Sequence, residues 1–368
     1  MRIVQVLPRG MHFGPQRATA IDLCARDIVG HSQYSRSTTV LGAPVEEPFE
    51  GVSFEPVQAG ATQVTSALRF AQAARTLTPD LVVVHQNVIS GAIIGRVLAP
   101  VPVLLYRHNL HKPGRALKRL YQRWQYSQFA GTIWVSDAAR LSFLASFPEF
   151  AASAVTVHAG LDLAAWSPVR EREQVVLCVG RATPDKGMLE AAQALCAALV
   201  NAPGWRARFI LSRLDRNDGY LQRVRQALAP LGSRADIQTD VRHSVVKRAY
   251  ESAAIAIVPS IFPEPFGRTA MEALAGGAAL VASRSGALPE VVGDAALSLE
   301  TVTPEAISAA VASLIANDGL RADYSARGRQ RAEQCFQLHE QGRVLDRLYE
   351  SMLGVREERW KVAAARAA

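Results

Sequence analysis

The sequence predicts an α/β protein of two doubly wound domains, each built on a parallel sheet. Its 368 residues exceed the usual size of a single hydrophobic core. Short apolar runs rich in Val, Ile and Leu alternate with helical patterns, which is typical of parallel strands joined by crossover helices. Polar residues 170–174 interrupt this alternation, and we interpret them as a linker. We expect domains at residues 1–168 and 169–350, and a tail at 351–368 that crosses back onto the first domain or stays frayed.

In the first half, seven segments have the length and the β-branched content of buried strands, and helical patterns fill most of the gaps. These expected strands are residues 2–7, 37–41, 52–56, 81–85, 102–107, 131–135 and 154–158. The second half restarts the alternation, and from residue 304 onward its pattern is helical only. Its expected strands are residues 175–179, 208–211, 254–258 and 278–282.

Composition excludes several classes of protein. Hydrophobic residues make up 49% and charged residues 20%, which is ordinary for a globular protein, and no uncharged apolar stretch could span a bilayer. A strand-like run begins directly after Met1, so we expect no signal peptide and a cytoplasmic location. The four cysteines lack the spacing of metal sites, and no D-x-D motif occurs, so neither a metal nor a disulfide is expected.

Positive charge is concentrated in one segment. The net charge is +8, yet residues 81–136 contain no Asp or Glu and seven Lys or Arg. Within it, apolar residues recur at helical spacing, so a helix there would carry an aromatic stripe with a basic edge. These stripe residues are Leu117, Leu120, Tyr121 and Trp124. Either this helix packs on its own domain, or it forms a platform for an anionic membrane or a phosphorylated, lipid-linked acceptor. No nucleic-acid motif accompanies the charge, so nucleic acid is not an expected partner.

Three glycine-containing turns follow expected strands, where backbone N–H groups at a helix start can bind phosphate. The first spans residues 8–15. The second spans residues 179–187, where Arg181 and Lys186 frame the turn and could both hydrogen-bond to a diphosphate. The third spans residues 259–277.

In the third turn, a helix is expected to begin at Gly267, so the amides of Gly267, Arg268 and Thr269 could bind phosphate oxygens. Glu264 and Glu272 flank this position. Because a carboxylate repels phosphate, we expect both glutamates to bind hydroxyls on either side of it.

Residues 264–277 resemble the E-x7-E signature of family 4 glycosyltransferases, which are retaining enzymes. Residues 180–187 resemble the donor loop of that family. Residues 158–168 resemble its segment between the domains, with Ala159 in place of the usual Asn. The resemblance extends to about Leu353 and implies the GT-B fold, in which two Rossmann-like domains face each other across a cleft.

The resemblance also implies roles for residues of the donor site. Glu264 would hold hydroxyls of the donor sugar, Glu272 the ribose, and Arg181 and Lys186 would neutralise the diphosphate. Gly14 would let the backbone of the first domain approach that diphosphate. The implied donor site comprises Gly14, Gly180, Arg181, Lys186, Val241, Glu264, Pro265, Phe266, Gly267, Arg268, Thr269 and Glu272.

His108 follows the strand at 102–107 and matches an active-site histidine of the family, so we expect it to be catalytic together with Glu264, Arg181 and Lys186. Because residues 81–136 contain no carboxylate to act as a nucleophile, we favour attack on the face from which the leaving group departs. The expected acceptor-side residues are His12, His85, Arg107, His111 and Lys112.

These expectations combine into one function. The chain would move a hexose, with retention, from a UDP- or GDP-hexose to a glycan or lipid-linked acceptor in lipopolysaccharide or exopolysaccharide synthesis. No cofactor or metal would be required. The enzyme would be cytoplasmic or peripheral on the inner face of the cytoplasmic membrane. The alternatives are a nucleotide-sugar epimerase or phosphorylase of the same fold, and a nonenzymatic relative that binds a nucleotide or lipid.

Overall fold

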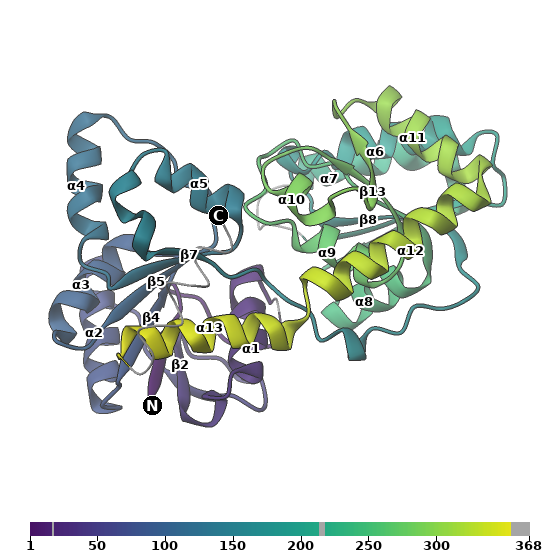
Figure 1. The fold of residues 1–368 in the computed structure, drawn as a ribbon. Helices are drawn as coiled ribbons and strands as arrows, with labels where there is room; N and C mark the ends of the chain where they lie inside the picture. The colour runs from purple at the N-terminus through teal and green to yellow at the C-terminus, as the bar shows by residue number, and fades with distance from the viewer. Residues whose placement is uncertain (17, 213–217, 355–368) are drawn as a thin grey trace. The chain divides into compact units, whose positions relative to one another are not determined.

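The computed structural model describes residues 1–16, 18–212 and 218–354. The chain divides into two compact units, and each contains one parallel sheet with its crossover helices (Figure 1). The first unit joins Met1–Gly160 to the segment that begins at Leu338, and the second is Leu161–Gln337. The junction thus lies eight residues before the one expected at residue 168, ahead of the polar segment, and the expected tail from residue 355 onward lies outside the described residues.

The first unit contains a seven-stranded parallel sheet in the order β3-β2-β1-β4-β5-β6-β7. Its strands are β1 (Ile3–Val6), β2 (Thr38–Gly42), β3 (Ser53–Pro56), β4 (Leu81–His85), β5 (Val103–Arg107), β6 (Gly131–Trp134) and β7 (Ala154–Thr156). Its helices are α1 (Ala20–His31), α2 (Gln63–Thr76), α3 (Val88–Leu98), α4 (Ala116–Tyr126), α5 (Asp137–Leu144) and α13 (Leu338–Met352). The chain order reverses between β1 and β4, so a crevice is expected at the carboxyl ends of these two strands.

The second unit contains a six-stranded parallel sheet in the order β10-β9-β8-β11-β12-β13. Its strands are β8 (Glu173–Arg181), β9 (Arg206–Ser212), β10 (Ala235–Thr239), β11 (Ala253–Val258), β12 (Ala279–Ser283) and β13 (Ala296–Leu299). Its helices are α6 (Met188–Leu199), α7 (Asp218–Leu228), α8 (His243–Ser252), α9 (Arg268–Ala275), α10 (Leu288–Val292), α11 (Pro304–Ala316) and α12 (Asp318–Cys335). Here the order reverses between β8 and β11.

All eleven expected strands are confirmed, with ends that differ by at most two residues. Two strands, β10 and β13, were not anticipated. Both lie at the edges of the second sheet, and β10 has no fully buried residue. An edge strand covers less of the core, so the sequences of these two strands lack the continuous apolar run by which a central parallel strand is recognised.

Helix α13 belongs to the first unit, although its residues were expected to fall in the second domain. Its apolar stripe, including Leu345 and Leu348, is buried. Polar contacts fix its register on α1: Asp346 accepts hydrogen bonds from the Ser32 hydroxyl and, at 2.9 Å, from the backbone N–H of Gln33. A side chain at Gly342 would meet a backbone oxygen of α1 at 2.7 Å, so glycine lets the two helices approach closely. Figure 1 shows α13 lying along α1.

Several helices begin where a side chain caps a strand-to-helix turn. At the end of β6, the Ser136 hydroxyl accepts from the backbone N–H of Ala139 at 3.0 Å. At the end of β4, Asn87 caps α3 by accepting from the N–H of Ser90 at 3.1 Å. These caps satisfy helix N–H groups that otherwise lack partners, and they define the loop edge of the first sheet.

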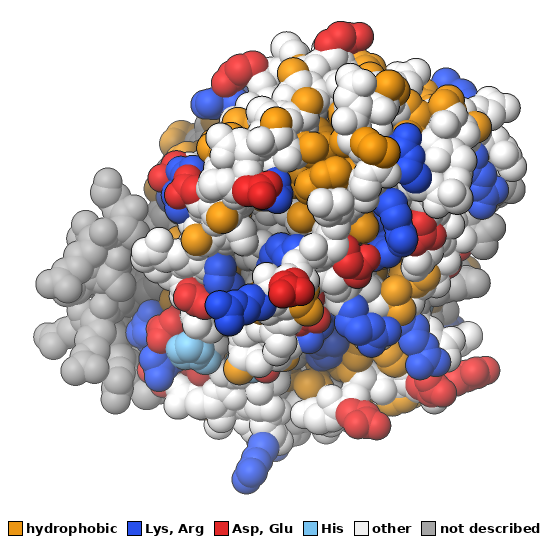
Figure 2. Space-filling model, turned by 90° about the vertical axis from the view of Figure 1, so that its right-hand side faces the viewer, with side chains coloured by type: hydrophobic (Ala, Val, Ile, Leu, Met, Phe, Trp, Pro, Cys, Tyr) orange, Lys and Arg blue, Asp and Glu red, His pale blue; other side chains and the backbone are white. Residues whose placement is uncertain are grey.

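None of the described helices is long and apolar enough to cross a bilayer. All four cysteines are free thiols. The face shown in Figure 2 carries Lys and Arg next to Asp and Glu, with small hydrophobic patches between them. Charge of both signs is therefore mixed on that face, in contrast to the segment of residues 81–136.

Candidate active site

The second and third glycine-containing turns meet at the topological switch point of the second sheet. The second turn follows β8 and the third follows β11, and these neighbouring parallel strands lie where the strand order reverses. In such an arrangement the connections from the two strands leave in opposite directions, and a crevice is expected at the carboxyl ends of the strands. The expected donor residues of the second unit are therefore brought to one place by the topology.

Backbone contacts fasten the two turns together. The N–H groups of Ile261 and Phe262 both donate to the carbonyl oxygen of Asp185, at 3.0 and 2.9 Å. Gly187 has φ of +65°, and a Cβ there would lie 2.1 Å from the carbonyl oxygen of Pro259. Only glycine fits this position, because any side chain would push the two turns apart.

We expect Gly187→Ala to destabilise the protein by about 2–4 kcal/mol, because it combines a left-handed backbone with a clash against backbone. Urea unfolding followed by circular dichroism measures the change. Gly219→Ala is the matched control, since a Cβ at Gly219 meets nothing within 4 Å and the residue lies in α7. A stability equal to that of the control would show that the two turns do not need this contact.

Glu264 has one carboxylate oxygen engaged by the protein. Oε1 accepts from the Lys186 ammonium and from the Ser260 hydroxyl, and the lysine and glutamate side chains are mostly buried. The backbone of Glu264 is held by the N–H of Ala287, which donates to its carbonyl oxygen at 2.8 Å. No described residue hydrogen-bonds to Oε2, so this oxygen is available to accept from a ligand hydroxyl.

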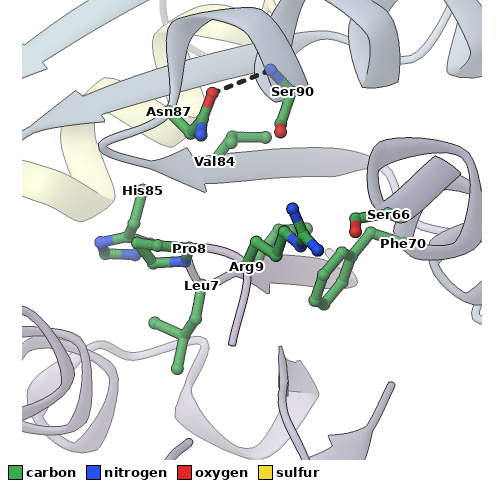
Figure 3. A pocket seen from close by; sticks show the side chains of 10 residues that line it. Leu7, Pro8, Arg9, Ser66, Phe70, Val84, His85, Asn87 and Ser90 are labelled. Atoms are coloured by element: carbon green, nitrogen blue, oxygen red, sulfur yellow. Dashed lines mark hydrogen bonds between the residues drawn. The ribbon is translucent and has the colours of Figure 1, made fainter. Parts of the chain in front are cut away.

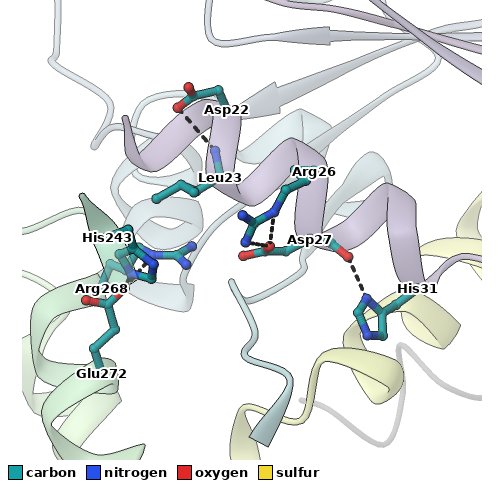
Figure 4. A network of polar contacts seen from close by, with 8 residues as sticks. All are labelled: Asp22, Leu23, Arg26, Asp27, His31, His243, Arg268 and Glu272. Carbon is teal, nitrogen blue, oxygen red and sulfur yellow. Dashed lines mark hydrogen bonds and ion pairs between the residues drawn. The ribbon is translucent and has the colours of Figure 1, made fainter. Parts of the chain in front are cut away.

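Glu272, on α9, is held in the same way by different partners (Figure 4). Its Oε1 accepts from His243 Nε2 at 2.9 Å and from Arg268 Nε at 2.8 Å. Burial alone would raise the pKa of Glu272, but the hydrogen bond from His243 and the charge of Arg268 outweigh it and lower this pKa below its ordinary value. The carboxylate is therefore ionised, and among described residues none hydrogen-bonds to its Oε2.

Arg181 lies at the end of β8, where it pairs with Asp185 at 2.9 Å. Its side chain is 44% exposed, so the guanidinium can turn towards an anion at low cost. Gly180 precedes it on the strand, and Val241 lies half-buried just beyond β10, at the same edge of the sheet. Arg181 and Val241, the residue expected to contact the nucleobase, therefore lie at the same edge of the second sheet.

Helix α9 points its amino terminus at this edge. Gly267 has φ of +106°, and a Cβ there would meet Leu288 at 2.5 Å, so the turn into the helix requires glycine. Among the described residues no side chain caps α9. Phe266 is buried and packs edge-to-face on Phe336, with ring centroids 5.7 Å apart, which anchors the start of the helix. Pro265 and Thr269, on either side of this start, are half-buried.

Two contributors were missed in the sequence. Ser260 holds the Glu264 carboxylate, and His243 holds the Glu272 carboxylate. Ser260 lies in the third turn and could have been found as a hydroxyl four residues before Glu264. His243 lies 29 residues from Glu272, and its position two residues after Val241 was the only available signal.

In the first unit, His85 and His108 lie together at the carboxyl ends of β4 and β5. Their nitrogens, Nδ1 of His85 and Nε2 of His108, are 2.9 Å apart. Arg107 donates to the carbonyl oxygen of Gln86, and its guanidinium lies 5.9 Å from the centre of the Trp134 ring. His85 is fully buried, so it contacts His108 from inside the unit and cannot itself contact an acceptor.

The other expected acceptor-side residues are placed differently. The His111 ring is buried among Tyr126, Phe143 and Phe147, because the chain turns inward after β5, so its position does not fit a surface contact. Burial, with the charges of Arg107 and Lys118, lowers the pKa of His111 to about 4, and the ring is neutral.

His12 is half-exposed and its Nε2 lies 3.0 Å from the carbonyl oxygen of Gln16, while Lys112 is exposed beyond β5. Gly14 is buried, and a Cβ there would lie 2.5 Å from the carbonyl oxygen of Glu47. Packing inside the first unit therefore already accounts for the absence of a side chain at Gly14.

A small pocket lies at the switch point of the first unit, between the ends of β1 and β4 (Figure 3). Arg9, Asn87 and Ser66 contribute polar groups to its wall, and Phe70 contributes an apolar one. Within either unit, no three described His, Cys, Asp or Glu side chains lie close enough together to hold a metal ion.

Two Rossmann-like units, the second with buried glutamates beside a glycine-containing turn that carries Arg181 and Lys186, have the arrangement of the GT-B fold of sugar-transferring enzymes. The structure of HepE from Anabaena, solved in complex with UDP and glucose, has the same fold: the TM-score is 0.77 at 18% identity, over 95% of this chain and 99% of that chain.

Residues 164–331 match the family described as glycosyl transferases group 1. The match lies within the second unit and covers less than half of the chain, so it shows that this part is similar to a family of glycosyltransferases. An uncharacterised glycosyltransferase of Methanocaldococcus jannaschii is 30% identical over 34% of this chain, but the match covers only 30% of that protein. Alpha-maltose-1-phosphate synthase of Mycobacterium tuberculosis is 26% identical over 71% of this chain and 79% of that protein.

Proposed function

We propose that the protein transfers a hexose, with retention of configuration, from a UDP- or GDP-hexose to a glycan or lipid-linked acceptor. The observation that carries the proposal is the arrangement at the switch point of the second unit. There Glu264 and Glu272 each have Oε1 engaged by protein partners and Oε2 available, while Lys186 and Arg181 supply positive charge. This matches a ligand with hydroxyls on both sides of a diphosphate.

The parts of the donor then have separate partners. The uncapped start of α9 and the two cations counter the charge that develops on the departing diphosphate. Glu264 accepts from hydroxyls of the hexose and Glu272 from the ribose. HepE, a protein of the same fold, was solved in complex with UDP and glucose, which supports a nucleotide of this type as the donor.

Thermal unfolding in the presence of UDP, GDP and ADP tests the donor site. A ligand that binds only the native state stabilises it by about 2.7 kcal/mol at a concentration of 100 times its Kd. We expect one uridine or guanosine nucleotide to raise the melting temperature and the others to raise it less. Incubation with the matching nucleotide hexose and an acceptor then yields a glycoside, whose anomeric configuration is read by NMR.

An α-configured product from an α-configured donor supports retention. An inverted product contradicts retention, and interconversion of the nucleotide sugar without any acceptor product indicates an epimerase. If none of the three nucleotides stabilises the protein, the proposed donor site is wrong.

We further propose that the acceptor is presented at an anionic membrane surface by α4. The expected helix is present, but its apolar stripe does not pack on the first unit. Leu117 is 83%, Leu120 63%, Tyr121 53% and Trp124 46% exposed. Exposed apolar residues at helical spacing, flanked by cations, fit a helix that lies in a lipid interface.

The charges around α4 favour an anionic partner. Lys112, Arg115, Lys118 and Arg119 are exposed, and Arg123 pairs with Glu149 at 2.9 Å. Each Lys or Arg near an anionic bilayer contributes about 1 kcal/mol of attraction. Lipid-linked acceptors have their phosphate at such a surface, so binding there would bring enzyme and acceptor together.

Replacing both Leu120 and Trp124 by Gln is expected to lower binding to vesicles of phosphatidylglycerol by at least about 10-fold, because each side chain loses a favourable transfer from water. Flotation of vesicles with bound protein measures this. Leu141→Gln is the matched control, because Leu141 is equally exposed but lies on α5. Equal flotation of both variants, or binding to phosphatidylcholine alone as strong as to phosphatidylglycerol, would contradict the proposal.

A further inference from the structure

A chain of buried hydrogen bonds leads from β1 to the active-site histidine. His85 Nε2 lies 2.8 Å from Oε1 of Gln5, and His85 Nδ1 lies 2.9 Å from Nε2 of His108. The two imidazole planes differ by only 11°, which suits a hydrogen bond in the plane of both rings. Gln5 and His85 are buried, whereas His108 is half-buried at the edge of the sheet.

Burial decides the charge of both rings. Desolvation lowers the pKa of His85 to about 3. Desolvation, with the neighbouring His85 and Arg107, lowers the pKa of His108 well below its ordinary value. The phenol of Tyr106 stacks against both rings, and two more titratable groups lie next to this network: Tyr349 beside Gln5 and Cys24 beside the Tyr106 hydroxyl. Both imidazoles are therefore neutral at pH 7, and each carries a single N–H.

Gln5 then determines which group donates and which accepts in each of these hydrogen bonds. An amide oxygen can only accept, so the proton of His85 resides on Nε2. His85 Nδ1 consequently has a lone pair and accepts from His108 Nε2–H. The single proton of His108 is thereby placed on Nε2, and its Nδ1 is an acceptor.

The backbone of His108 is fixed as well. Its N–H donates to Oε1 of Gln86 at 2.9 Å. Gln86 has φ of +63°, a region that a residue with a side chain rarely occupies, and its own N–H donates to the carbonyl oxygen of Tyr106 at 2.7 Å. His108 Nδ1, in contrast, hydrogen-bonds to no residue in the described part of the chain.

We propose that Gln5 and His85 are positioning residues that set the tautomer of His108, so that Nδ1 of His108 accepts a hydrogen bond from a hydroxyl of the sugar substrates. This assignment excludes the opposite role, in which the ring would donate a proton to the leaving diphosphate. Only the identity of the ligand, a sugar hydroxyl, rests on the proposed transfer function. The tautomer itself is a property of the protein alone.

NMR of the full chain labelled with 15N-histidine tests the tautomer directly. At pH 7 we expect His108 to show a protonated Nε2 and a pyridine-type, unprotonated Nδ1. Gln5→Met removes the acceptor, so His85 can place its proton on Nδ1 and donate to His108. We expect the Nδ1 signal of His108 to move towards the protonated position in this variant, with a loss in kcat of at least about 10-fold, since a wrong imidazole tautomer can cost far more.

Tyr349→Phe is the matched control. The Tyr349 hydroxyl lies 3.5 Å from Nε2 of Gln5, on the other end of the amide, so its removal leaves the bond to His85 in place. We expect the tautomer to be unchanged and kcat to stay within about 2-fold of the unmodified protein, because the chain through His85 and His108 is not interrupted.

His85→Phe gives a second readout if Gln5→Met does not fold. The phenyl ring keeps the contact with Tyr106 but accepts no hydrogen bond, so His108 Nε2–H loses its partner and the tautomer of His108 is no longer fixed. We expect the 15N spectrum of this variant at pH 7 to show both tautomers of His108, and kcat to fall as it does in Gln5→Met.

An Nδ1 of His108 that is protonated in the unmodified protein would overturn the inference, as would a Gln5→Met spectrum identical to it. Expected spectra combined with no sugar transfer by the unmodified protein would uphold the tautomer and refute the proposed function instead.

Discussion

Glu264→Gln is expected to reduce sugar transfer by about 10²–10³-fold while leaving the affinity for the free nucleotide diphosphate nearly unchanged. The substitution keeps the shape of the side chain and an acceptor for Ser260, but it removes the charge that pairs with Lys186. If Glu264 holds the hexose, the loss falls on transfer, because the nucleotide without its sugar does not contact it. Rates of product formation and calorimetric titration of the nucleotide separate the two effects.

Glu300→Gln provides the comparison for Glu264→Gln. Glu300 belongs to the same unit and pairs with Arg284 at 3.2 Å, but it is well exposed and lies on no expected donor contact. Its replacement should leave both transfer and nucleotide affinity as they are. Full turnover by Glu264→Gln would refute the assignment of the donor sugar to this carboxylate.

Lys186→Met is expected to weaken binding of the nucleotide diphosphate by about 30-fold. A hydrogen bond to a charged group contributes about 2 kcal/mol, and each 1.4 kcal/mol changes Kd tenfold. The substitution conserves volume but removes the ammonium that would meet the diphosphate. Titration calorimetry with UDP and GDP measures the change in Kd.

Lys247→Met is the control, because it removes a lysine from the same unit at a position that is not expected to contact the diphosphate. Lys247 lies in the same unit and pairs with Glu251 at 3.1 Å, on α8 and away from the two turns. We expect its replacement to leave the nucleotide affinity unaltered. Equal Kd values for both variants would place the diphosphate away from Lys186 and would refute the donor site proposed for the second unit.

The predictions for Glu264→Gln and Lys186→Met distinguish the residue that binds the sugar of the donor from the residue that binds its diphosphate. A nucleotide that binds normally to Glu264→Gln but weakly to Lys186→Met would assign the sugar to the first residue and the diphosphate to the second. The reverse result would require the donor to lie in the opposite orientation across the switch point.

Local patterns in the sequence were sufficient for the architecture. The alternation of apolar runs and helical periods predicts eleven strands in parallel sheets, and parallel strands place their following loops at one edge. The order of the strands came from the structure. Glycines at positions with positive φ, such as Gly187 and Gly267, mark the turns because few other residues adopt that backbone. Edge strands β10 and β13 escaped this reasoning because they bury little.

Four properties depended on contacts between residues far apart in the chain. These are the pairing of Glu264 with Lys186, 78 residues away, the hold of His243 on Glu272, the packing of α13 on α1, and the exposure of the stripe on α4. A sequence pattern states which face of a helix is apolar, but the neighbouring elements decide whether anything covers that face.

The sequence alone therefore determined the fold class, the two turns that meet in the second unit and the residue types available for a sugar nucleotide. Periodicity, glycine conformation and charge are local, so they can be read without coordinates. Only the tertiary structure decided which oxygen of each glutamate is engaged, how His108 is protonated and where the last helix packs. Each of these depends on atoms that folding alone brings within hydrogen-bond distance.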